Sequence, residues 1–127
     1  ETPGEIVCCI NQSLAMKYRR ELDKIQYCLN KKYDTIHMIG GGIQSNLLCQ
    51  MTANATGCRV AAGPVEATAF GNIAVQMIAL GQIKDIKEAR EIIERSEATC
   101  YYEPQNTEEW SQAYARYCQV TKRQEEE

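Results

Sequence analysis

Thr35–Gln50 reads TIHMIGGGIQSNLLCQ, and this stretch decides the fold. Its short apolar run, Thr35–Ile39, ends in three glycines, and a helical pattern begins directly after them. This order is typical of a strand, a tight glycine turn and a helix N-terminus. The first backbone N–H groups of a helix have no partner within it, and the helix dipole adds partial positive charge there. The turn therefore predicts a site for a phosphate or a polar nucleoside.

Helical and strand patterns alternate on both sides of this stretch. Upstream, Thr2-Pro3-Gly4-Glu5 predicts a capped helix whose apolar residues recur every three or four positions as far as Leu29. Downstream, a second short strand is predicted at Arg59–Ala62, and the segment 96–106 reads as an extended tail. Further helices are predicted over about 44–56, 66–80, 85–95 and 107–121. The alternation predicts an α/β fold with a short parallel sheet and flanking helices.

Two strands are too few for a complete parallel sheet, which normally has several strands and is covered on both faces. The chain is therefore expected to be a piece of a larger domain, or to complete its sheet with another copy of itself. An open sheet edge invites such pairing, so a homo-oligomer is one expectation.

Composition excludes several classes of partner and site. The 127 residues carry a formal net charge of -3, so no basic field favours a nucleic acid. No apolar run is long enough to predict a membrane span, and the acidic N-terminal stretch does not resemble an export signal. The seven cysteines form no CxxC pair and His37 is the single histidine, so no metal site is predicted. The thiols are expected to be reduced and buried, as in a cytoplasmic protein.

Several other residues admit a functional and a structural interpretation. His37 is a possible base, but a buried strand histidine is favoured. Glu66 is expected to stabilise a helix N-terminus rather than face a ligand, and Gly71 to permit close packing on the sheet. Cys49 is interpreted as core rather than as an activated thiolate. The aromatic residues are expected to pack rather than to stack a ligand, and they are Tyr101, Tyr102, Trp110, Tyr114 and Tyr117.

The chain resembles a known family over nearly its whole length. The motifs that carry the resemblance are the triplet Gly40-Gly41-Gly42, the following Gln44 and Leu47-Leu48, and GPVEAT at Gly63–Thr68 with Gly71-Asn72. Together they resemble the C-terminal domain of the FGGY family of carbohydrate kinases, and the GPVEAT block resembles its rhamnulokinase branch. The resemblance is weakest after Pro104. The family usually has an Ala-Asp pair where this chain reads Ala53-Asn54.

The resemblance implies a partial actin/Hsp70-like (ribonuclease H-like) ATPase domain. Residues 1–127 would form the C-terminal portion of the FGGY C-terminal domain, with the first strands of that domain and the whole N-terminal domain absent. The intact enzyme would be a cytoplasmic, ATP- and Mg²⁺-dependent kinase that converts L-rhamnulose to L-rhamnulose 1-phosphate. The catalytic aspartate would lie outside this chain, so the 127 residues alone are expected to be inactive and to hold no metal ligand.

By motif, the resemblance assigns this chain the adenosine side of the ATP cleft. Gly41 is the best candidate for backbone contact with the nucleotide, and Gly42, Gln44 and Ser45 are weaker candidates beside the base. Two alternatives remain open. One is a generic Rossmann-like nucleotide-binding module, because a glycine turn after a strand is common. The other is an inert kinase fragment that associates with itself.

Overall fold

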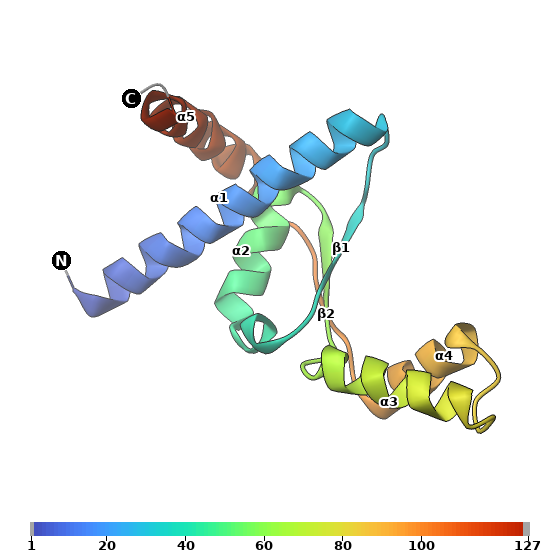
Figure 1. Cartoon of the computed structure of the whole chain (residues 1–127). Helices are drawn as coiled ribbons and strands as arrows, with labels where there is room; N and C mark the ends of the chain where they lie inside the picture. Colours follow the sequence, from blue (N-terminus) through green and yellow to red (C-terminus); the bar gives the residue numbers. More distant parts are fainter. Residues whose placement is uncertain (1, 126–127) are drawn as a thin grey trace.

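The computed structural model describes residues 2–125, with side chains as far as residue 122. Five helices, three strands and a short 3₁₀ helix follow one another in it (Figure 1). In chain order they are α1 (Pro3–Leu29), β1 (Thr35–Met38), η1 (Gly41–Gln44), α2 (Asn46–Thr56), β2 (Arg59–Ala62), α3 (Ala67–Ala79), α4 (Ile86–Ser96), β3 (Cys100–Tyr102) and α5 (Thr107–Glu125). None of the helices within residues 2–125 is long and apolar enough to cross a lipid bilayer.

The first helix begins where its capping sequence predicts. The backbone N–H of Glu5 donates to Thr2 Oγ1 at 3.3 Å, and the Glu5 carboxylate accepts from the Thr2 backbone N–H at 2.7 Å. This reciprocal pair satisfies two amides at a helix start. The helix ends at Asn30, which adopts the left-handed conformation with φ 47°. Local sequence alone therefore defines this element.

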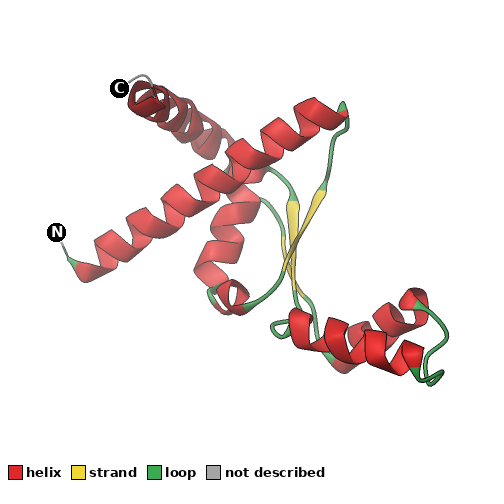
Figure 2. Cartoon of the chain, viewed as in Figure 1, coloured by secondary structure: helices red, strands yellow, loops and turns green. Residues whose placement is uncertain are grey.

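The sheet contains three strands and is mixed, which corrects the expectation of a parallel two-stranded sheet (Figure 2). β1 and β2 run parallel, with Ile36 opposite Val60. β3 lies antiparallel on the other side of β2, with Tyr102 opposite Val60. The segment expected to be an extended tail is thus a strand. Its consecutive tyrosines are typical of a strand in a half-buried sheet. They form one here because the free edge of β2 supplies a backbone for β3 to pair with.

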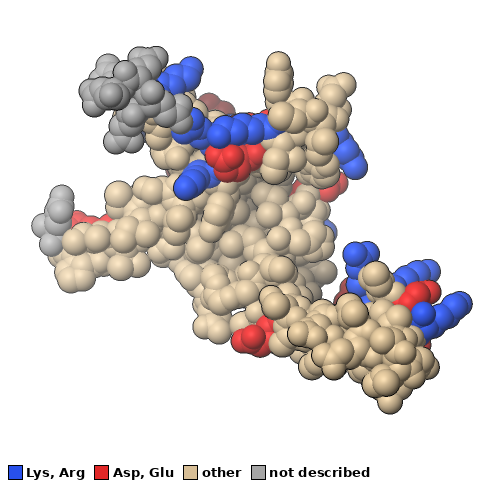
Figure 3. Space-filling model, in the orientation of Figure 1, with Lys and Arg blue, Asp and Glu red and all other residues tan. Residues whose placement is uncertain are grey.

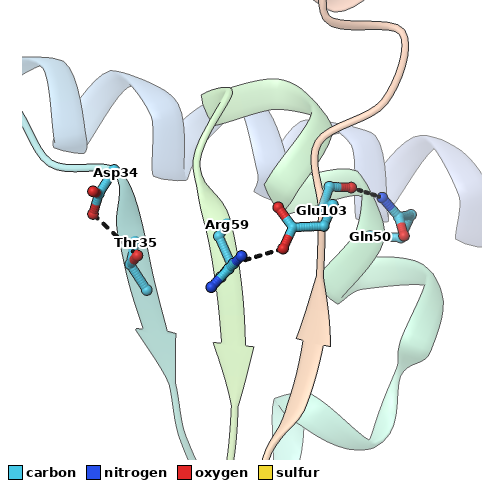
Figure 4. A network of polar contacts seen from close by, with 5 residues as sticks. All are labelled: Asp34, Thr35, Gln50, Arg59 and Glu103. Carbon is cyan, nitrogen blue, oxygen red and sulfur yellow. Dashed lines mark hydrogen bonds and ion pairs between the residues drawn. The ribbon is translucent and has the colours of Figure 1, made fainter.

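Polar contacts fasten this third strand at the amino ends of β1 and β2 (Figure 4). Arg59 Nε lies 2.6 Å from Glu103 Oε1, and Gln50 Nε2 donates to the Glu103 carbonyl oxygen at 2.8 Å. Asn54 Oδ1 accepts from the Gln105 backbone N–H at 2.9 Å. Asn54, the residue that departs from the family pattern, therefore keeps a structural acceptor role. The contacts join β2 and α2 to the chain that follows β3.

The core lies on one face of the sheet. α2 packs there, and its Cys49 and Ala53 join Val60 and Ala62 of β2 in one cluster. A second cluster lies behind α2, where α1 and α5 meet it. Its buried members are Ala15, Met16, Met51 and Ala55, and Trp110, Ala113, Tyr114 and Tyr117 pack against them. Three of the five aromatic residues expected to pack thus do so in this second cluster.

The other face of the sheet is open, and this overturns the expectation of burial on both faces. His37 is exposed, whereas a buried strand histidine was expected. Ile39 and Tyr101 are each 59% exposed. The reason is that α1, α2 and α5 lie together on one side, while α3 and α4 stand apart from them toward the carboxyl ends of β1 and β2 (Figure 1). No described element covers His37.

α3 has no buried residue, although most of its residues are apolar. Gly71 in its middle is exposed, and a β-carbon built there meets no atom within 4 Å. The expected close packing of Gly71 on the sheet is therefore not found among residues 2–125. Glu66 occupies the N-cap position of α3 but makes no capping hydrogen bond with its side chain. Its expected helix-start location is confirmed, whereas side-chain capping is not.

The cysteines are less buried than expected. All seven are free thiols, but only Cys49 and Cys58 are buried, while Cys9, Cys28 and Cys100 are exposed. Burial raises the pKa of the Cys49 and Cys58 thiols, so both stay protonated near neutral pH. The interpretation of Cys49 as a core residue is confirmed, and the general expectation of buried cysteines is wrong. Cys9 and Cys28 of α1 and Cys100 of β3 face solvent, and Cys8 and Cys118 are half-buried.

A phenol–carboxylate contact links α5 to α1. Tyr114 OH donates to Asp23 Oδ2 at 3.0 Å, and the Arg19 guanidinium lies 4.2 Å from the centre of the Tyr114 ring. Arg19 also donates to the Ala55 carbonyl oxygen at 3.0 Å and to Ser111 Oγ at 3.2 Å. Burial, and then the bond to Asp23, raise the pKa of Tyr114 above its ordinary value. The contact between α5 and α1 therefore favours the protonated form of the Tyr114 phenol.

This shift predicts a pH-dependent contribution to stability. Because the folded-state pKa of Tyr114 lies above its unfolded value, the contribution is fully present below about pH 10 and is lost as the pH rises further. Tyr114→Phe should lower the free energy of unfolding by about 1 kcal/mol at pH 8. The difference between wild type and variant should shrink toward about pH 11. Urea denaturation of both proteins at the two pH values measures it, and a constant difference would contradict the assignment.

Candidate functional site

Two glycine-containing turns lie side by side at the carboxyl ends of the parallel strands. β1 leads into the turn Gly40–Ser45, and β2 leads into Gly63–Glu66. The Gly63 backbone N–H donates to the Met38 carbonyl oxygen at 3.0 Å, and the Gly40 N–H donates to the Pro64 carbonyl oxygen at 3.4 Å. We call this pair of turns the glycine edge. In open α/β sheets, ligands bind outside the carboxyl ends of the strands.

Backbone geometry explains two of the glycines at this edge. Gly40 has φ 83° and ψ -174°, a conformation that is almost restricted to glycine. Gly63 has φ 148°, and a β-carbon there would lie 3.3 Å from Thr99 Cα. These two residues are therefore required by the chain's own folding.

Neither a positive φ nor a close neighbour explains Gly41 and Gly42. Neither has a positive φ, and a β-carbon at either position meets no atom within 4 Å. Both residues are exposed. Glycine at these positions is thus explained neither by backbone strain nor by packing among the described residues. It leaves space for a group that approaches the backbone closely.

The same two residues offer free hydrogen-bond donors. They open η1, so their N–H groups have no partner within it, and no other described residue accepts from them. No residue from Gly40 to Leu47 is charged. The turn therefore presents neutral backbone donors, which suit the polar atoms of a nucleoside or an inner phosphate.

Gln44 and Ser45 complete the predicted set on the same turn. The Gln44 side chain is exposed at the end of η1. Ser45 caps α2, because its hydroxyl oxygen accepts from the Leu48 backbone N–H at 3.2 Å. Its hydroxyl hydrogen remains available to a ligand, since a hydroxyl both donates and accepts. α2 therefore begins at Asn46, after a 3₁₀ turn, rather than at Gln44, and Leu47 is 47% exposed.

A groove of about 670 Å³ lies beside the glycine edge, between the open face of the sheet and the α3–α4 pair. His37, Ile39 and Tyr101 line one side, and Val75, Ile78 and other residues of α3 and α4 line the other. Pro64 and Ala67 connect it to the glycine edge, but none of the four predicted site residues lines it. The predicted residues thus form a rim rather than an enclosed pocket.

Sequence reasoning did not identify Gly63 and Pro64 as part of the site. The structure places their turn beside Gly40 and shows a cis peptide bond between them. The available signal was the parallel order of the two strands, because the carboxyl ends of parallel neighbours lie at one edge.

The described residues bring no group of three or more His, Cys, Asp or Glu side chains together in a way that suits a metal ion. Glu66 is the only charged residue in the two turns. The end of β2 carries glycine and proline instead of the acidic residue that holds a ribose in a Rossmann site. The geometry therefore supports backbone contact with a polar ligand and assigns no acid, base or metal ligand.

Comparisons with known proteins identify the family of this chain. The sequence model of the FGGY family of carbohydrate kinases, C-terminal domain, matches residues 1–80. A rhamnulokinase of Bacteroides thetaiotaomicron is 42% identical over 117 residues, which are 92% of this chain and 24% of that protein. A rhamnulokinase of Bacillus subtilis is 44% identical over 95 residues, 75% of this chain and 20% of that protein. The chain thus spans a fifth to a quarter of the length of these relatives.

Proposed function

Because the chain belongs to the FGGY family of carbohydrate kinases, we propose that it is part of an ATP-dependent sugar kinase and forms the adenosine side of its nucleotide cleft. The observation that carries this proposal is the pair of exposed glycines after β1. Gly41 and Gly42 have open space where side chains would be, and their N–H groups have no acceptor among residues 2–125. Both features suit a nucleotide lying against the backbone.

Within this proposal each predicted residue has a role. The N–H groups of Gly41 and Gly42 donate to polar atoms of the nucleoside or its inner phosphate. Gln44 and Ser45 lie farther along the turn and contact the base. None of these groups accepts or donates a proton in the reaction, so their contribution is binding and orientation of ATP.

The proposed sugar substrate is L-rhamnulose, with L-rhamnulose 1-phosphate as product. Support comes from the relatives named rhamnulokinase, which are 42% and 44% identical to this chain over the matched residues. The first four residues of the GPVEAT motif, Gly63–Glu66, form one half of the glycine edge. No residue of this chain is assigned to the sugar.

Mg²⁺ in such a kinase neutralises phosphate charge during transfer. The turn Gly40–Ser45 offers backbone amides, one amide side chain and one hydroxyl, whereas Mg²⁺ prefers carboxylate and water oxygens. We therefore assign no Mg²⁺ ligand to this turn. The metal and the catalytic carboxylate belong to the rest of the proposed enzyme.

The first test is an activity measurement in two arms. The purified 127-residue chain, with ATP, Mg²⁺ and L-rhamnulose, should give no ADP above the background of a coupled assay. The same chain co-expressed with the B. thetaiotaomicron rhamnulokinase from which the 117 matched residues are deleted should restore rhamnulose-dependent ADP formation. Turnover by the chain alone would refute the assignment of catalysis to the missing part. A stable complex of the two pieces without rhamnulose-dependent turnover would refute the proposed place of this chain in the nucleotide cleft.

A further inference from the structure

Two cysteines from distant parts of the chain lie on the same side of the sheet. Cys100 of the edge strand β3 is opposite Ala62 of β2. Directly opposite residues of antiparallel strands point to one face, with their β-carbons about 5 Å apart. The Ala62 side chain belongs to the buried cluster that also contains Cys49 of α2. Cys100 therefore lies on the α2 side of the sheet, next to the cluster that holds Cys49.

Hydrogen bonds hold β3 and the residue after it against α2 at the level of Cys49. Tyr102 OH donates to Asn46 Oδ1 at 2.9 Å. Gln50 Nε2 donates to the Glu103 carbonyl oxygen at 2.8 Å (Figure 4). On α2, the first of these contacts lies three residues before Cys49 and the second lies directly after it. The helix and the strand are thus already fixed together where the two cysteines are.

The ionisation of one thiol affects the other. Burial, and then the charge of the Cys100 thiolate, raise the pKa of the Cys49 thiol. Burial, and then the charges of the same two thiolates, raise the pKa of Tyr102. Charges shift a neighbouring pKa in this way over a few ångströms. Both sulfur atoms therefore lie in one small region between α2 and β3.

The two thiols differ in their access to solvent. Cys49 is 0% exposed, whereas Cys100 is exposed at the edge of the sheet. A dissolved oxidant can therefore reach Cys100 and not Cys49. No residue from Thr35 to Cys58 is acidic or basic, and Figure 3 shows that the surface over the amino end of α2 is largely free of charged side chains. An anionic oxidant thus meets no fixed negative charge on α2.

We propose that Cys49 and Cys100 form a reversible redox pair that a small disulfide, such as glutathione disulfide, oxidises. The Cys100 thiolate attacks one sulfur of the oxidant, which forms a mixed disulfide and releases one glutathione thiolate. The Cys49 thiol then gives up its proton and attacks the Cys100 sulfur, and the second glutathione thiolate leaves. Two electrons pass from the protein thiols to the oxidant, and the two protons end on two molecules of glutathione. Excess reduced thiol reverses both steps.

The disulfide would change the contacts of α2 in two ways. It closes a loop that contains β2, α3 and α4, and so holds β3 on α2 by a covalent bond. It also removes the hydrogen that the Cys49 thiol donates to the Ile43 carbonyl oxygen at 3.7 Å. Ile43 lies in η1, on the turn that carries Gly41 and Gly42. Formation of the pair does not depend on nucleotide binding.

Peptide mapping tests the pair in the purified 127-residue chain. The protein is equilibrated with excess glutathione disulfide, its remaining thiols are blocked with N-ethylmaleimide, and it is digested with trypsin. Trypsin releases Cys49 in the peptide 33–59 and Cys100 in the peptide 96–116. Most of the second peptide should be recovered linked to the first through Cys49, and dithiothreitol should separate them. A Cys100 that stays a thiol, keeps glutathione, or links to Cys58 or to a second chain would overturn the inference.

Cys49→Ala isolates the first step of the oxidation. Without the second thiol, the mixed disulfide cannot resolve, so glutathione on Cys100 should be at least about tenfold more abundant than in the wild type. Circular dichroism checks that the variant folds. Equal amounts of glutathione on Cys100 in the two proteins would contradict the proposed second step.

Cys100→Ser tests the pair without a change in the core. Because Cys100 is exposed, this variant should fold even if Cys49→Ala does not. Its Cys49 should remain a thiol under the same oxidising conditions. Cys28→Ser is the matched control, since Cys28 is also exposed but lies in the last turn of α1, and it should leave the yield of the linked peptides within about twofold of the wild type. Oxidation of Cys49 in Cys100→Ser, or equal yields in the two serine variants, would overturn the inference.

Discussion

Gly41→Val should lower kcat/KM for ATP by about 100-fold or more in the reconstituted kinase, and Gly41→Ala by about tenfold. The reason is steric, because a β-carbon at Gly41 points into space that the chain leaves empty within 4 Å. Only a ligand that lies against the backbone meets the added group. KM for the sugar should change little, since no residue of this turn is assigned to it.

Gly4 provides the matched control for this experiment. Like Gly41, it has no positive φ, and a β-carbon there meets no atom within 4 Å, but it lies in the first turn of α1. Gly4→Ala should therefore leave ATP kinetics unchanged. Both alanine variants should unfold at the same urea concentration as the wild type or slightly higher, because alanine restricts the unfolded chain. Unchanged ATP kinetics in Gly41→Val would show that the nucleotide does not contact this turn.

The same contact has a readout without activity. Addition of ADP to the reconstituted complex should shift the backbone amide signals of Gly41 and Gly42 in a ¹⁵N-correlated spectrum, while the Gly4 signal stays in place. A flat titration at millimolar ADP in a complex that still turns over would place the nucleotide elsewhere.

Val60→Asp should abolish cooperative folding of the chain. Val60 is 0% exposed at the centre of β2, where it lies opposite Ile36 of β1 and Tyr102 of β3. A carboxylate there has no basic partner in the surrounding cluster of Ile43, Cys49, Ala53 and Ala62. Burying an unpaired charge destabilises a protein by about 4 kcal/mol or more, which is comparable with the whole stability of a small domain.

Val120→Asp is the control for that substitution. Val120 lies on α5 with 60% of its side chain exposed, so the same chemical change should alter the free energy of unfolding by less than about 0.5 kcal/mol. Circular dichroism and urea denaturation measure both variants. A Val60→Asp protein that unfolds with the midpoint of the wild type would mean that the three strands do not enclose this side chain.

The elements that were predicted well are those specified by local interactions. α1 begins at its capping box, and β2 occupies Arg59–Ala62 as predicted. The run before the glycines is a strand, and Gly41 and Gly42 after it are exposed. The assignment of Gly41, Gly42, Gln44 and Ser45 to a nucleotide stays a prediction, because their geometry permits the contact and no ligand tests it.

The errors concern contacts between segments far apart in the chain. Tyr102 pairs with Val60 across more than 40 residues, and no local pattern distinguishes such a strand from an extended tail. His37 follows an apolar pattern typical of a strand buried on both faces, yet it is exposed. That pattern reports the environment for which the residues are suited, and residues 2–125 supply only one of the two covering layers.

By itself, the sequence determined the approximate positions of the helices, the two parallel strands, the glycine turn and the family. Capping, periodicity and backbone restriction act over a few residues, so they can be inferred without coordinates. Only the tertiary structure decided that a third strand runs antiparallel to β2, that the two turns meet at Gly40 and Pro64, and that one face and one edge of the sheet are open. These features depend on which distant segments pack together, and packing is set by the competition among all apolar surfaces of the chain rather than by any single stretch.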